Sequence, residues 1–195
     1  MTGTRERIME TTAELFRRQG YQGTGLKQIS RESSATFGSL YHFFPGGKEQ
    51  LGVEVVRCSG RGFQDLGIAI FGAASDVIAA TRELFSGAAE VLRGTSYADA
   101  CPIATVALEV ASTSEPLREA TAEVFDSWIS ALCSVFERVG IPVATSRALA
   151  LQALSALEGA FVLCRARRST DALDAAAELM VQAVRAALQD TGGSG

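Results

Sequence analysis

The sequence predicts an all-α protein. Its 195 residues show no sustained alternation of apolar and polar positions, which is the pattern of a half-buried strand, and Ala, Leu, Glu and Arg dominate. Hydrophobic residues make up 47% of the chain, which is enough for a sizeable core. Helix-breaking residues divide the chain into segments of helical length, among them Pro45-Gly46-Gly47, Gly94, Gly140 and Pro142. We expect a small helical domain at the N-terminus and a larger helical domain after it.

The first expected helix covers residues 5–19. Its apolar positions Ile8, Met9, Leu15 and Phe16 fall on one helical face, and Gly20 follows as a stop signal. The segment is therefore amphipathic, and we expect its apolar face to pack against the helices that come next.

Two short helices are expected next, over residues 26–33 and 37–44. Thr24 is the expected cap of the first and Thr36 of the second, because a Thr hydroxyl can accept a hydrogen bond from a backbone N–H of the first helical turn. Ser34 and Ala35 would form a tight turn between the two helices. The pattern is a helix, a tight turn and a second helix.

The rest of the chain is expected to form six longer helices. One covers residues 48–70, and its four glycines, each costing about 1 kcal/mol relative to Ala, predict that it bends or frays. The other five are expected over residues 75–93, 103–112, 115–139, 143–167 and 170–189. Residues 191–195 are expected to be a disordered tail.

Charge is unevenly distributed along the chain. The net charge is −4, but residues 1–51 carry seven basic and five acidic side chains, a net charge of +2. The remainder carries eleven basic and seventeen acidic side chains, a net charge of −6. A basic head on an acidic body is what we expect of a protein that touches DNA at one end only.

The two short helices on this basic head indicate a helix-turn-helix. Leu26, Ile29 and Leu40 would bury the inner faces of the pair, and the small residues of the turn would let the helices approach. The second helix could then enter the major groove, which is wide enough for one helix. A purely structural pair of helices is the alternative that the pattern alone leaves open.

Several motifs in residues 7–51 narrow that choice. They are Arg7-Ile8-Met9, Leu15-Phe16, Gly20-Tyr21 with Thr24, Ile29, Gly38-Ser39-Leu40-Tyr41, Phe44 and Lys48. Together they resemble the N-terminal DNA-binding domain of the TetR family. The run from Ser39 to Leu51, and the stretch from Cys101-Pro102-Ile103-Ala104 to Leu108-Glu109, are similar to the LmrA/YxaF-like subgroup. The resemblance implies a helix-turn-helix DNA-binding domain at residues 1–50 and a larger helical ligand-binding and dimerisation domain at residues 51–190.

Two positions depart from the family pattern. Ser34 stands in the turn where the family commonly has Gly, so Ser34 must accept whatever backbone conformation that turn imposes. Phe43 stands where the family commonly has His, and His42 lies one place earlier.

The resemblance implies two groups of DNA contacts. Thr36, Phe37 and Ser39 would face the groove, and Gly38 would let the backbone approach closely. The expected phosphate contacts and their flanking residues are Tyr41, His42, Lys48, Thr24 and Lys27. Hydroxyl and ammonium groups donate to phosphates, which positions a protein without reading sequence, whereas Phe37 could read only by apolar contact, for example with a thymine methyl. Tyr41 has an alternative role as a helix-packing aromatic.

The same resemblance implies a homodimer, double-stranded operator DNA and a small apolar or aromatic inducer as partners. Candidate ligand-binding residues are the large apolar side chains Phe85, Leu108, Phe125, Trp128 and Phe161, each of which could equally be ordinary core. A seam for close helix approach would consist of the small residues Ala148, Ala153, Ala156, Gly159 and Ala160. That segment and the last helix could pair with a second copy in a four-helix bundle.

Other classes of function find little support. The sequence has no metal-ligand spacing and no phosphate-binding loop, and nothing beside its one histidine, His42, suggests a catalytic triad, so we expect no enzyme, metal or cofactor. Cys101 before Pro102 could be a redox-sensing thiol or plain packing. Arg165, Arg167 and Arg168 fit cations at a helix C-terminus better than a second DNA patch.

Charged residues or Gly interrupt every apolar run, so we expect no membrane segment and no secretory signal, and we expect the cytoplasm as the location. Two alternatives stay open. One is a repressor without a small-molecule ligand, controlled by its abundance or by a protein partner. The other is an all-helical enzyme or carrier whose head is only structural.

Overall fold

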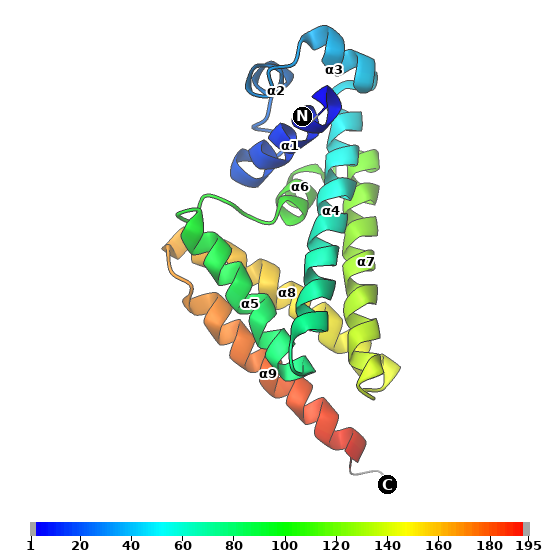
Figure 1. The fold of residues 1–195 in the computed structure, drawn as a ribbon, viewed down its shortest axis with the longest axis vertical. Coiled ribbons are helices and arrows are strands. Elements are labelled where there is room, and N and C mark those ends of the chain that lie inside the picture. Colours follow the sequence, from blue (N-terminus) through cyan, green and yellow to red (C-terminus); the bar gives the residue numbers. More distant parts are fainter. Residues whose placement is uncertain (1–2, 193–195) are drawn as a thin grey trace. The chain divides into compact units, whose positions relative to one another are not determined.

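The structure is a computed structural model that describes residues 3–192. Within those residues the chain forms nine α-helices and no strand, which confirms the all-α prediction. The helices are α1 (Thr4–Gln19), α2 (Leu26–Glu32), α3 (Phe37–Phe43), α4 (Gly47–Ala73), α5 (Val77–Gly94), α6 (Pro102–Val110), α7 (Glu115–Arg138), α8 (Val143–Arg167) and α9 (Asp171–Gly192) (Figure 1). Of the expected tail, Thr191 and Gly192 belong to α9, and residues 193–195 lie outside the described residues.

One of the two expected helix caps is present and the other is not. The Oγ1 atom of Thr36 accepts a hydrogen bond from the Ser39 N–H at 3.1 Å and caps α3, as expected. The expected cap by Thr24 is wrong, because α2 begins after Gly25 and receives no side-chain cap. The Thr24 hydroxyl instead donates to the carbonyl oxygen of Gly20 at 2.6 Å.

The chain divides into two compact units, which we describe separately. The first consists of the residues up to Gly62 and of Cys101–Val124, and the second of Phe63–Ala100 and the residues from Phe125 onward. Helices α4 and α7 each contribute to both units. The first unit therefore contains α6 in addition to α1–α3, and the domain boundary after residue 50 stays a prediction.

The first unit is organised around the inner faces of α1, α2 and α3. Its fully buried side chains include Ile8, Phe16, Ile29, Leu40, Phe44 and Leu51. At the start of α1, Arg5 forms an ion pair with Glu54 of α4, and its guanidinium lies 5.5 Å from the centre of the Phe44 ring. These contacts join the start of α1 to α4 and to the residue that follows α3.

Helix α4 runs without a break from Gly47 to Ala73 despite its glycines. A Cβ atom placed on Gly60 would lie 2.5 Å from both methyl groups of Val124 on α7, so this glycine permits close approach of the two helices. Nearby, Arg57 donates to the Glu123 carboxylate through Nε at 2.8 Å and through Nη2 at 3.1 Å. Packing against α7 thus compensates for the low helix propensity of glycine in this part of α4.

The second unit has its core between α5, α8 and α9, and α9 packs along both of the other helices. Large members of the core are Phe85, Leu92, Leu149, Leu173, Met180 and Val184. Arg82 of α5 pairs with Glu178 of α9, and Nη1 of Arg93 donates to Oγ1 of Thr170 at 3.2 Å. Polar contacts therefore support the α5–α9 packing at two places, one of them at the end of α5.

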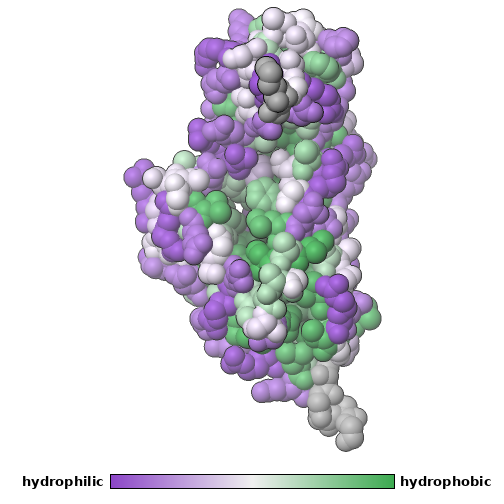
Figure 2. All heavy atoms as spheres, viewed as in Figure 1, coloured by the Kyte–Doolittle hydropathy of each residue, from purple (hydrophilic) through white to green (hydrophobic). Residues whose placement is uncertain are grey.

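Helix α8 is less buried than its composition suggests. It is long and apolar enough to pass a composition test for a membrane-spanning helix. Only 28% of its most apolar window is buried within the chain. The exposed fraction is 61% for Val162 and 53% for Leu163, and Leu179 on α9 is 63% exposed. Figure 2 shows hydrophobic side chains reaching the surface over the second unit, whereas the surface of α1–α3 is mostly polar on the face drawn.

Gly60 and Gly62 provide a matched test of the α4–α7 packing. We expect Gly60→Ala to lower the free energy of unfolding by about 1–3 kcal/mol, because the new methyl group overpacks against Val124. Gly62→Ala should instead raise it by up to about 1 kcal/mol, because nothing lies within 4 Å of a Cβ there and alanine favours the helix. Urea unfolding of the two variants measures both changes, and equal changes of the same sign would contradict the packing.

Candidate nucleic-acid interface

Helix α3 has one buried face and one exposed face. Leu40 is fully buried against the first unit, as is Phe44, which follows the last residue of α3. Elsewhere on α3, Phe37 in the first turn is 42% exposed and Tyr41 is 50% exposed, and His42 is also exposed. Three of the residues that the sequence analysis assigned to DNA contact, Phe37, Tyr41 and His42, are thus exposed on α3, and Tyr41 is not a core aromatic.

The N-terminus of α3 is capped by a side chain and is also exposed to solvent. Thr36, which is exposed, holds Ser39 through its cap hydrogen bond and through a second contact between the two hydroxyl oxygens at 3.0 Å. A Cβ atom placed on Gly38 would meet only Oγ1 of Thr36, at 3.7 Å. The space beside Gly38 is therefore open, and the fold of the described residues does not require glycine there.

The turn between α2 and α3 requires one residue in the left-handed backbone conformation. Ser34 has a φ of +53°, in the region where glycine is usual, so this serine accepts the conformation that the sequence analysis expected of it. Hydrogen bonds hold the turn on both sides. Ser33 donates its hydroxyl to the carbonyl oxygen of Ile29 at 2.7 Å, and Ser30 donates to that of Ala35 at 2.6 Å. The crossing of α2 and α3 is thereby fixed.

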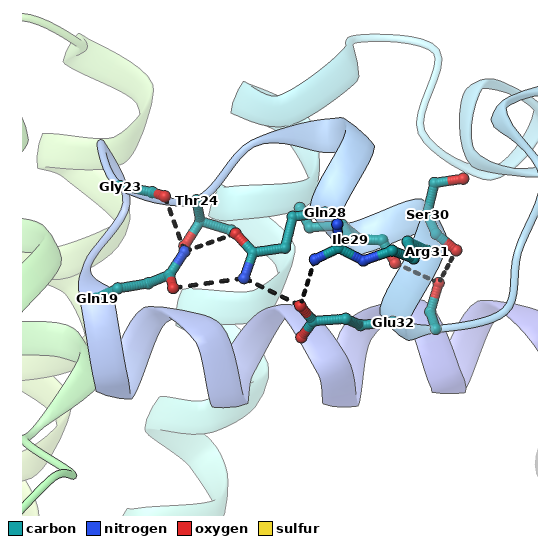
Figure 3. Close-up of polar contacts among 9 residues, drawn as sticks. Gln19, Gly23, Thr24, Gln28, Ile29, Ser30, Arg31 and Glu32 are labelled. Carbon is teal, nitrogen blue, oxygen red and sulfur yellow. Dashed lines mark hydrogen bonds and ion pairs between the residues drawn. The ribbon is translucent and has the colours of Figure 1, made fainter.

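A polar network joins the end of α1 to α2 (Figure 3). The amide nitrogen of Gln19 donates to the Gly23 carbonyl at 2.7 Å and to Oε1 of Gln28 at 2.8 Å. Gln28 in turn donates to Glu32 at 3.0 Å. The sequence analysis did not assign Gln19 or Gln28, because an amide pair nine residues apart has no local signature.

The expected flanking residues differ in accessibility. Thr24 is fully buried and its hydroxyl is used within the turn, so the structure does not place that side chain at the surface. Lys27 is exposed on α2. Lys48 is half-buried at the start of α4, and its ammonium nitrogen lies 4.1 Å from the centre of the Tyr21 ring. Burial lowers the pKa of Lys48 from its usual value, and the nearby Glu109 carboxylate opposes that shift.

The candidate ligand residues do not form one group. Phe85 is fully buried in the core of the second unit, and Phe161 packs against that core. Trp128 makes edge-to-face contacts with Phe125, at 5.8 Å between ring centres, and with Phe63, at 6.2 Å. Leu108 belongs to the first unit, where it is 82% exposed.

Phe63, on α4, is an aromatic residue that the sequence analysis did not assign to the ligand site. Within the described residues no group of His, Cys, Asp and Glu side chains is arranged to hold a metal ion. Cys101 is buried at the N-cap of α6, where its sulfur accepts from the Ala104 N–H at 3.5 Å. The contact makes Cys101 the N-cap residue of α6.

Two family models match the chain. Residues 8–55 match the bacterial regulatory proteins of the tetR family, and residues 77–179 match the C-terminal domain of LmrA/YxaF-like transcriptional regulators. The HTH-type transcriptional regulator YxaF of Bacillus subtilis is 36% identical over 160 residues, which are 82% of this chain and 84% of that protein. LmrA of the same organism is 33% identical over 178 residues, which are 87% of this chain and 91% of that protein.

A solved structure shows the same fold. The TetR transcriptional regulator from Legionella pneumophila superimposes with a TM-score of 0.83 over 93% of this chain and 97% of that chain, at 23% sequence identity. The matched families and relatives are transcriptional regulators rather than enzymes. The residues that match the tetR family include both α2 and the exposed helix α3. The chain therefore belongs to the TetR family of transcriptional regulators, in its LmrA/YxaF-like group.

Proposed function

We propose that this regulator is a dimeric repressor that binds a palindromic operator through α3 and is released from it by a small apolar or aromatic molecule. The observation that carries the proposal is the exposed outer face of α3 on a firmly packed head. Phe37 and Tyr41 are large side chains, and the chain leaves about half of each exposed. Exposed aromatic side chains often mark an interaction surface, and the basic charge around them favours DNA as the partner.

The chemistry of this face divides into reading and anchoring. Phe37 and Ser39 would lie against base edges, where an apolar ring distinguishes a thymine methyl group from other bases. Tyr41, His42 and Lys48 would donate to phosphates together with Lys27, which adds affinity without sequence preference. Gly38 would allow the start of α3 to approach the DNA closely, because the space beside it is open.

Dimerisation is supported by the surface of α8 and α9. Of the five small residues in the expected seam, Ala153 and Ala160 are buried within the protomer, so they contribute to its own core. Ala148 and Gly159 are exposed instead, and a Cβ atom on Gly159 would have nothing within 4 Å. Polar residues such as Gln152 share this exposed side of α8, which suits a protein partner better than lipid. A second copy would cover both helices and restore a four-helix bundle.

The ligand proposal relies on the aromatic side chains of the second unit. Phe63, Phe125 and Trp128 form an edge-to-face cluster that is only partly buried. Rings in this arrangement present apolar faces and edges that suit an aromatic guest. The ligand would act by preferring the state in which the two copies of α3 are wrongly spaced for adjacent grooves, because only differential affinity moves an equilibrium. A coupling of about 1–3 kcal/mol would loosen DNA binding roughly 5- to 150-fold.

Reading and anchoring residues should respond differently to truncation. Lys48→Ala should weaken binding to every sequence and lower the slope of log affinity against log salt concentration by about 1. Phe37→Ala should leave that slope unchanged and reduce the preference for the best site over single-base variants, which we expect to be about 1–3 kcal/mol per base pair. Leu66→Ala, at a residue that is 55% exposed in the second unit, is the control and should change neither quantity. If Phe37→Ala keeps full base preference, the orientation of α3 on DNA is not the proposed one.

The dimer can be tested with a charge at its proposed centre. Gly159→Arg should place a cation in the interface without a clash inside the protomer, because the space around Gly159 is open. Sedimentation at micromolar concentration should show a dimer for the wild type and a monomer or a loss of folded protein for this variant. Gly72→Arg on α4 provides the same charge at another exposed and open glycine, and it should remain dimeric. A folded wild-type monomer would contradict the proposal.

Trp128 is the one tryptophan of the chain, so its fluorescence reports directly on the aromatic cluster. Aromatic compounds that release the protein from a DNA duplex should change this emission. Phe125→Ala should weaken that release, whereas Val91→Ala, at an exposed residue of α5, should not. If releasing compounds leave the emission unchanged, the ligand binds elsewhere. If no compound in a broad aromatic library releases DNA, the regulator without a small-molecule ligand becomes the better account.

A further inference from the structure

Lys48 lies in a group of polar side chains that joins the α1–α2 turn and the start of α4 to α6 and the turn after it. We call Tyr21, Lys48, Glu49, Glu109 and Ser114 the junction cluster, and all five belong to the first unit. Ser114 donates its hydroxyl to Oε2 of Glu49 at 2.8 Å, which directs that carboxylate towards the turn after α6. Glu109, on α6, is the cluster's other acidic residue.

The carboxylate of Glu109 is held by backbone rather than by a flexible partner. Its Oε2 atom accepts a hydrogen bond from the backbone N–H of Gln22 at 2.8 Å. Its Oε1 atom lies where Gly20, which has a φ of +77°, would otherwise carry a side chain, because a Cβ there would be only 1.9 Å away. Any residue other than glycine at position 20 would therefore displace this carboxylate. The negative charge is fixed at the α1–α2 turn.

The ammonium group of Lys48 is in turn held near that charge. It lies over the Tyr21 ring, at 4.1 Å from its centre, and Tyr21 belongs to the turn that Glu109 contacts. Burial raises the pKa of Tyr21, as does Glu49, so this phenol is neutral when it faces the ammonium. Burial lowers the pKa of Lys48, and the Glu109 carboxylate opposes that shift, as a nearby negative charge does. A carboxylate that attracts an ammonium competes with any other anion for it.

We propose that Glu109 is a positioning residue that acts through Lys48, and that its carboxylate competes with DNA phosphate for the Lys48 ammonium group. The proposal rests on the proposed function, in which Lys48 contacts a phosphate. Glu109 thereby lowers the affinity for DNA of every sequence, and it does so by its charge rather than by its hydrogen bond to Gln22.

The test is the binding of the full-length protein to a random-sequence DNA duplex, measured from low to moderate salt. Glu109→Gln keeps the shape of the side chain and an oxygen that can accept from Gln22, so only the charge is lost. We expect this variant to bind about 2- to 5-fold more tightly at low salt and to have a steeper salt dependence. Glu109→Asp keeps the charge and should bind like the wild type. Glu10→Gln, at an exposed position of α1, removes the same charge from the first unit and should have a smaller effect.

A double-mutant cycle isolates the role of Lys48. In the Lys48→Ala background, Glu109→Gln should no longer tighten binding beyond the Glu10→Gln control. The proposal is overturned if Glu109→Gln binds like the wild type, if Glu109→Asp tightens binding as much as Glu109→Gln, or if the gain persists without Lys48. If the wild type shows no salt-dependent binding, or if Lys48→Ala binds as tightly as the wild type, the phosphate role of Lys48 fails, and this inference fails with it.

Discussion

Burial of the inner face of the helix-turn-helix is the constraint on which the rest of the DNA-binding surface depends. Leu40 and Phe44 are fully buried together with Ile29, and this packing fixes the rotation of α3 about its own axis. With that rotation Tyr41 is 50% exposed, and Phe37, in the first turn of α3, is 42% exposed. The Thr36 cap and the left-handed Ser34 then determine where α3 begins and how it crosses α2.

Close backbone approach is the second recurring device of the first unit. Gly60 lets α4 lie against Val124, and Gly20 leaves room for the Glu109 carboxylate at the α1–α2 turn. In both places an atom from a distant part of the chain takes the space that a Cβ atom would need. Glycines that weaken an isolated helix or turn can therefore strengthen the assembled unit, because tertiary contacts replace the lost local preference.

Much of the fold follows from local sequence, because helical periodicity, caps and breakers act over a few residues. The expected helix over residues 143–167 is α8 itself, and Thr36 caps α3 as expected. Exposure is harder to predict, because it depends on partners far along the chain. Thr24 carries a hydroxyl that could cap a helix or contact a phosphate, but it is buried in its turn. Leu108 is an apolar residue that we expected to line a pocket, but it is 82% exposed. The pairing of Glu109 with Gln22 spans 87 residues and has no local signature.

We propose that the exposed side chains of α3 read operator DNA in a symmetric complex. Hydroxyl-radical footprinting of the wild-type protein on the DNA that flanks its own gene tests that claim most directly. The account predicts two protected half-sites of a palindrome, with centres one helical turn, about 34 Å, or a multiple of that distance apart. Footprints without a palindrome, or uniform protection that disappears at moderate salt, would show non-specific binding only and would contradict the account.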